Sequence, residues 1–200
     1  MSGPPSPKSM LLANVPVVGL PQLLPDPAKS RARSGKTAGV QAGKAVADPC
    51  GSVTRSTITG LRSKIQEACT VAQTNVNANG AGVPGAEYPG AATYSLTVLT
   101  LALDGMDQLH LWLDTNGMYV APDDRVTNAS AAFNVSAYCR EISSHLHHGR
   151  YWAAVSAAWN SSRNTAQPAL DCVERVSEAL ALLDPLAANA TRCYLSAYFP

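Results

Sequence analysis

The chain has 200 residues, of which 46% are hydrophobic and 14% are charged, and its formal net charge is +1 at pH 7. This composition fits one globular domain with length to spare for a tail. Residues 50–200 hold nine basic and twelve acidic side chains, which argues against a strong general attraction to nucleic acid.

Residues 1–49 have the composition of a mobile leader. They contain eight of the fourteen prolines and a short basic cluster at residues 29–36, so they bury little apolar surface. An apolar stretch at residues 10–24 is interrupted by Pro16 and Pro21 and lacks a small-residue cleavage site. Because no run of about 18 apolar residues occurs, no membrane span is predicted. The location of the protein, cytoplasmic or secreted, stays open.

The ordered domain is predicted to begin near Cys50 and to run to residue 200. Ile58, Leu61, Ile65 and Cys69 recur at helical spacing and predict an amphipathic helix over residues 57–73. The following stretch, residues 76–90, is rich in Gly and Pro and predicts a loop.

Residues 94–120 carry the strongest strand signals. Three apolar runs, at residues 95–103, 109–113 and 118–120, are separated by Asp104-Gly105 and by a second turn signal at residues 114–117. In the second run three leucines alternate with His110 and Trp112. This pattern predicts a three-stranded antiparallel meander, covered on its aliphatic face by helices.

The last third of the chain predicts mainly helices. Residues 129–142, 151–159 and 170–183 show helical spacing, residues 145–149 resemble a strand end or turn, and Asp184-Pro185 should end the last helix. Residues 193–200 are apolar and aromatic. An apolar end of this kind predicts docking, including self-association of the chain.

The cysteines and histidines predict no metal site. The five cysteines have no CxxC spacing, and reduced, buried thiols are favoured. His145, His147 and His148 could bind a metal with Cys139 or Asp123, but no second cluster accompanies them. Four Asn-x-Ser/Thr sequons occur, at Asn128, Asn134, Asn160 and Asn189, and they matter only if the chain enters the secretory pathway.

The order of these segments over residues 53–183 resembles that of the plant ribosome-inactivating proteins, the rRNA N-glycosylases. The sequence TITGLRSKIQEAC at residues 57–69 resembles the first helix of that family, and residues 95–120 resemble its central hairpins. The resemblance implies an α+β fold, a small antiparallel sheet packed against helices, that is incomplete at its C-terminal end. It implies hydrolytic removal of an adenine from large-subunit rRNA, with the ribosome as partner and without a cofactor.

The site residues that the resemblance implies match only in part. Tyr151 takes the place of one base-stacking tyrosine, and His110 stands where the other is expected. In one alignment the catalytic Glu and Arg helix lies beyond the end of the chain, and in another Glu178 is the catalytic carboxylate but Ala181 replaces the arginine. We therefore expect a weak or inactive enzyme. The alternatives are a non-catalytic module that binds nucleic acid or protein, and a secreted structural glycoprotein.

Overall fold

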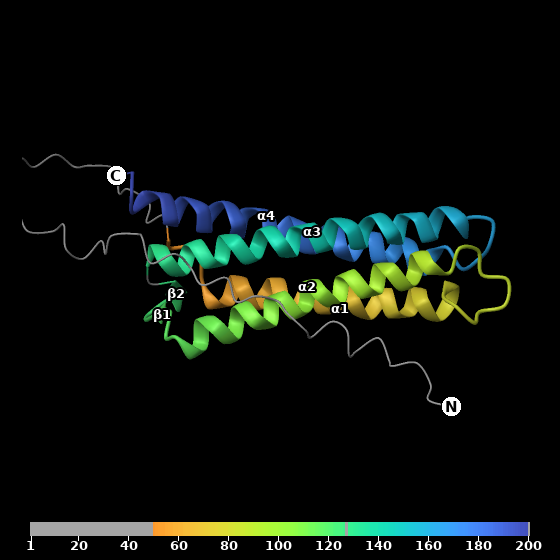
Figure 1. The fold of residues 1–200 in the computed structure, drawn as a ribbon, viewed down its shortest axis with the longest axis horizontal. Coiled ribbons are helices and arrows are strands. Elements are labelled where there is room, and N and C mark those ends of the chain that lie inside the picture. Colours follow the sequence, from red (N-terminus) through yellow and green to blue (C-terminus); the bar gives the residue numbers. More distant parts are fainter. Residues whose placement is uncertain (1–49, 127, 200) are drawn as a thin grey trace, which may run out of the picture. The chain divides into compact units, whose positions relative to one another are not determined.

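The computed structural model describes residues 50–199 except residue 127, so the predicted leader over residues 1–49 lies outside the described residues. Four long helices run up and down side by side (Figure 1). They are α1 (Arg55–Asn79), α2 (Gly90–Thr115), α3 (Ala129–Trp159) and α4 (Gln167–Ser196). Each helix packs against the next one in the chain, and α4 packs against α1. The described chain is therefore an antiparallel four-helix bundle.

One spacing rule explains why all four segments are helical and why they associate. In each helix the buried residues recur alternately three and four positions apart, which places them on a single stripe along the helix. The stripe of α2 consists of Ser95, Leu99, Ala102, Met106, Leu109 and Leu113. The stripe of α4 consists of Ala169, Cys172, Val176, Ala179, Leu183, Leu186, Ala190 and Cys193. Facing stripes of this kind form the core of a bundle.

The predicted three-stranded meander is wrong, because most of residues 94–120 belong to α2. The side chain of Leu111 is 68% exposed, whereas Leu109 and Leu113 are fully buried, so the three leucines do not share one strand face. Gly105 lies inside the helix and faces Ile142 of α3. The Thr- and Val-rich sequence has strand propensity, but burial of the α2 stripe in the bundle favours the helix more strongly.

The expected mixture of helices and antiparallel sheet is present only in a reduced form. Two short strands, β1 (Tyr119–Val120) and β2 (Arg125–Val126), pair antiparallel in the connection between α2 and α3. The turn expected at residues 114–117 is confirmed, because α2 ends at Thr115 and Gly117 has a φ of +61°. The chain therefore has the coarse content of an α+β protein, with helices greatly in excess.

Three further boundaries differ from the sequence-based expectation. Helix α1 extends to Asn79, because Ala72, Asn75 and Asn79 continue its buried stripe. Helix α3 is continuous through residues 145–149, where a strand end or turn was predicted. Helix α4 passes through Pro185, which is exposed, while Leu186, Ala190 and Cys193 continue to pack beyond it. The burial of these three residues after Pro185 thus stabilises the helix more than the backbone hydrogen bond that the proline removes would have done.

A disulfide closes one end of the bundle. Cys50, just before α1, is bonded to Cys193 near the end of α4, across a sequence separation of 143 residues. The expectation that the cysteines are reduced is wrong for this pair. It is confirmed for Cys69, Cys139 and Cys172, which are free and buried.

Helices α2 and α3 approach closely at a glycine. A Cβ atom on Gly149 would meet Leu99 Cδ2 at 2.5 Å and Cγ at 2.7 Å. At the same level the hydroxyl of Ser95 donates a hydrogen bond of 2.9 Å to the carbonyl oxygen of Gly149. The missing side chain is therefore a condition for this contact between the helices.

We expect the double substitution Cys50→Ser and Cys193→Ser to lower the free energy of unfolding by about 2–5 kcal/mol, because the unfolded chain gains the freedom that the crosslink removed. Thermal unfolding with and without a reducing agent measures this. Reduction of the wild-type protein should produce the same loss, whereas the double variant should not respond to reduction. Equal melting temperatures for the wild type and the variant would contradict the crosslink.

We expect Gly149→Ala to destabilise the bundle by about 1–3 kcal/mol, the usual cost of an overpacked core position. Gly60→Ala is the matched control, because Gly60 lies inside α1 and an added Cβ would meet no atom of another helix within 4 Å. That control should instead stabilise the protein by roughly 0.5–1 kcal/mol through helix propensity. Denaturant unfolding of both variants checks the difference, and equal effects would show that the contact with Leu99 is unimportant.

Candidate functional site

The structure does not bring the three residues suggested by the sequence together. His110 lies near the C-terminal end of α2, where its Nε2 is 3.5 Å from the Asp114 carboxylate. Tyr151 lies in the second half of α3 and is 59% exposed. Glu178 lies in α4 and contacts α1. Neither of the two pockets described below is lined by both a stacking ring and this carboxylate.

Glu178 has the environment of a surface ion pair. Arg175 Nη1 lies 2.8 Å from its Oε1, and Lys64 Nζ lies 3.5 Å from its Oε2. The hydrogen bond from Arg175, supported by Lys64, holds the pKa of Glu178 below its ordinary value. A carboxylate kept ionised in this way links α4 to α1 through its contact with Lys64.

The free thiols are not suited to nucleophilic chemistry. Burial raises the pKa of Cys69 and Cys172 to about 11 and that of Cys139 to about 12. All three are therefore protonated at neutral pH, and a protonated, buried thiol is a poor nucleophile. Within the described residues, no group of three or more His, Cys, Asp or Glu side chains could hold a metal ion.

The most distinctive surface feature is a cluster of five aromatic rings at the end of the bundle opposite the disulfide. Trp152 is its centre, with ring centroids of Tyr88, Tyr94 and Tyr151 at 6.3, 5.4 and 5.2 Å. Trp159 joins through Tyr88 at 5.9 Å. Every ring except that of Trp152 is at least 45% exposed. We call these five residues the aromatic surface.

Local structure holds the aromatic surface in place. Tyr88 has a φ of +44°, a left-handed conformation that is strained for a residue with a large side chain. The loop that carries it is tied to α3, because Asn160 accepts a hydrogen bond from the Glu87 amide and donates one to the Glu87 carbonyl, both at 3.4 Å. Arg163 donates two further hydrogen bonds to the carbonyl oxygens of Pro84 and Gly85.

Buried amides support the same end of the bundle from within. Asn75 and Asn79 of α1 are fully buried. Asn75 Oδ1 accepts hydrogen bonds from Asn79 at 2.9 Å and from Ser156 of α3 at 3.2 Å, and Asn79 also donates to the Thr165 carbonyl at 2.7 Å. This network joins α1, α3 and the connection to α4, so it fixes the platform on which the rings lie.

A basic pocket adjoins the aromatic surface at Tyr151. It has a volume of about 370 Å³ and is lined by His147, Arg150, Tyr151, Ala154, Val173 and Ser177. None of these lining residues is acidic. The guanidinium of Arg150 lies 3.4 Å from His147 Nδ1, and in the described part of the chain it forms no ion pair with a carboxylate. The pocket therefore contains an aromatic ring, Tyr151, and a cation, Arg150, whose charge no carboxylate among the lining residues neutralises.

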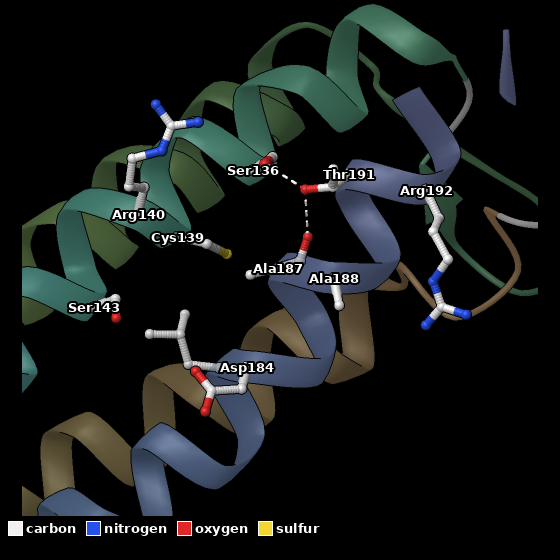
Figure 2. Close-up of a pocket in the computed structure, with 10 residues that line it drawn as sticks. Ser136, Cys139, Arg140, Ser143, Asp184, Ala187, Ala188, Thr191 and Arg192 are labelled. Atoms are coloured by element: carbon white, nitrogen blue, oxygen red, sulfur yellow. Dashed lines mark hydrogen bonds between the residues drawn. The ribbon is translucent and has the colours of Figure 1, made fainter. Parts of the chain in front are cut away.

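A second groove, of about 520 Å³, lies between α3 and α4 near the disulfide end. Figure 2 shows that the charged groups of Arg140, Asp184 and Arg192 point away from one another. Their side chains do not converge on a common point, so this groove lacks the arrangement that catalysis or tight binding of a small ligand requires.

The sequence indicates Tyr151 only as a base-stacking residue, and it does not predict the aromatic surface as a unit. The helical spacing of Trp152 and Trp159 predicts only that both belong to the core. Tyr88 lies in a predicted loop and Tyr94 directly before a predicted strand, and nothing in their spacing relates either of them to α3. Only the antiparallel packing of α2 on α3 brings these rings together.

Comparison of the chain with known protein families, with curated proteins and with solved structures finds no match. None of the described helices is long and apolar enough to cross a membrane.

Proposed function

We propose that this protein is a non-catalytic protein-binding module whose aromatic surface docks a partner segment that carries an acidic side chain beside apolar groups. The observation that carries the proposal is the exposure of four Tyr and Trp residues, grouped around the partly buried Trp152 at one end of the bundle. Tyrosine and tryptophan are the side chains that most often dominate the binding energy of protein interfaces.

Burial of these exposed rings against a partner is more favourable in free energy than their exposure to water. Each Tyr or Trp can bury roughly 150–250 Å² of surface, and contiguous apolar patches are uncommon on proteins that have no partner. The loop and amide contacts described above fix the rings before binding, which reduces the conformational entropy lost on association.

The charge of the partner follows from the basic pocket. Arg55, Arg62 and Arg175 are paired with carboxylates of the chain itself, whereas Arg150 is not. An acidic side chain placed in the pocket beside Tyr151 would supply the missing carboxylate to Arg150 and His147. The excess of acidic residues over residues 50–200 makes the phosphate backbone of a nucleic acid the poorer candidate.

The rRNA N-glycosylase activity remains a prediction with less support. The resemblance relied on central hairpins, and that segment is α2 in this structure. His110 lies toward the disulfide end of the bundle and Tyr151 toward the other end. The alignment that makes Glu178 catalytic offers no arginine in the required position. Self-association through the C-terminal end also stays a prediction. There Tyr194 packs between Phe133 and Tyr198, while Phe199 is 76% exposed.

The proposed interface can be tested with a library of displayed random peptides selected on the full chain. We expect enriched peptides to combine Asp or Glu with aromatic or large aliphatic residues. Trp159→Ala and Tyr151→Ala should each weaken binding of the selected peptides at least tenfold, about 1.4 kcal/mol. Arg150→Gln should weaken the binding of acidic peptides more than the binding of the same peptides with Asn or Gln in place of Asp or Glu. Titration monitored by tryptophan fluorescence gives the affinities.

Leu111→Ala is the matched control, since Leu111 is the most exposed aliphatic side chain of α2 and lies outside the aromatic surface. This variant should bind like the wild type. The proposal fails if no motif is enriched, or if the ring variants and the control bind equally well.

For the enzymatic alternative we expect no adenine release when the purified protein is incubated with intact ribosomes. The reason is that neither of the two pockets described above brings a carboxylate, a cation and two rings together. Adenine chromatography and aniline cleavage of the rRNA measure the reaction. Turnover that is lost in Glu178→Ala and in Tyr151→Ala would instead establish the glycosylase and overturn the non-catalytic proposal.

A further inference from the structure

The four sequons differ sharply once they are placed on the bundle. Asn128, Asn134 and Asn189 lie toward the end that carries the disulfide, and Asn160 lies at the end that carries the aromatic surface. We infer that the protein folds in an oxidising secretory compartment and carries N-linked glycans at the disulfide end, on Asn128, Asn134 and Asn189, while Asn160 stays unmodified. This inference does not depend on the proposed binding function.

The disulfide supports an oxidising compartment. It joins Cys50 to Cys193 through a covalent bond between the start of α1 and the end of α4. Structural disulfides form and persist in the secretory pathway and are rare where thiols are kept reduced. In that compartment the sequons are exposed to the enzyme that transfers oligosaccharide to asparagine.

Asn128 can carry a glycan without loss of its structural role. Its Oδ1 accepts a hydrogen bond of 2.8 Å from the Ala131 amide and thereby caps α3. Its Nδ2, the atom that is glycosylated, donates a long hydrogen bond of 4.0 Å to Met118 Sδ. The residue is exposed, so attachment at Nδ2 leaves the cap intact.

The sequons of Asn134 and Asn189 lie next to each other on α3 and α4. Their hydroxyl residues, Ser136 and Thr191, are hydrogen-bonded across the groove at 2.9 Å (Figure 2). Both asparagines are partly exposed. Asn189 accepts a hydrogen bond of 2.6 Å from Arg192 with its Oδ1, so a glycan on Nδ2 leaves the acceptor of that bond in place.

Asn160 has the opposite environment. Its side chain is fully buried, and Nδ2 donates hydrogen bonds to the carbonyl oxygens of Ser156 at 2.8 Å and Glu87 at 3.4 Å. A glycan on this nitrogen would displace the loop that carries Tyr88. Chains modified there could not complete the fold, so the folded protein should lack this glycan.

The covalent step is a transfer from a lipid-pyrophosphate-linked oligosaccharide, the donor of the secretory pathway. The asparagine Nδ2 forms a bond to the anomeric carbon of the first sugar. The bond between that carbon and the pyrophosphate oxygen breaks with its electron pair, and the lipid pyrophosphate leaves. One amide proton passes to the transferring enzyme, so the product is a neutral N-glycosyl amide.

The test is expression of the full chain, with its own N-terminus, in cultured eukaryotic cells. We expect removal of N-glycans by an amidase to increase the gel mobility, and peptide mass spectrometry to locate glycans on Asn128, Asn134 and Asn189. The peptide with Asn160 should be unmodified. Alkylation of the unfolded, unreduced protein should label three thiols, rising to five after reduction.

Variants of the hydroxyl residues separate the sites without changing the asparagines. Ser130→Ala, Ser136→Ala and Thr191→Ala should each remove one glycan, whereas Ser162→Ala should leave the mass of the glycans unchanged. The inference is overturned if the full chain carries no glycan, if any one of the three sites is unoccupied throughout, or if folded protein carries a glycan on Asn160.

Discussion

The alternating three- and four-residue spacing of buried positions is the constraint on which the rest of this structure depends. It holds along the whole length of all four helices, including stretches where the buried residue is Ser, Asn or Gly. Since a position on the stripe must face the neighbouring helices, small and polar residues there are forced into the core. The Ser95 to Gly149 hydrogen bond and the amides of Asn75 and Asn79 are consequences of that geometry.

The same mixed stripe explains how far the fold could be predicted from sequence. Helices were predicted where large apolar residues occupy the stripe, as at Ile58, Leu61 and Ile65. Where Ala, Ser or Gly takes these positions, large apolar residues no longer mark the stripe. The predicted secondary structure then follows the local β-propensity. This is why α2 was mistaken for strands, and why α3 was divided at Gly149, the very residue that allows α2 to approach.

The candidate site was predictable only in fragments, for a different physical reason. Its rings come from the loop before α2, from α2 and from α3. A single sequence does not show which residues of two different helices are in contact. The ion pair of Glu178 is different, because its partner Arg175 lies one turn away on the same helix and their spacing alone predicts the contact. Contacts within one helix can be predicted from the spacing of the residues in the sequence. Contacts between helices can be predicted only when the packing of the helices is known.

The bond between Cys50 and Cys193 also determines how this protein would respond to mechanical tension. A force applied through the segments outside these two residues passes directly across the sulfur–sulfur bond and bypasses the four helices that lie between them. The helices would remain packed under a pull that separates the ends of an uncrosslinked bundle. With the bond intact the domain is a short, inextensible link, and after reduction it becomes a long, extensible spacer.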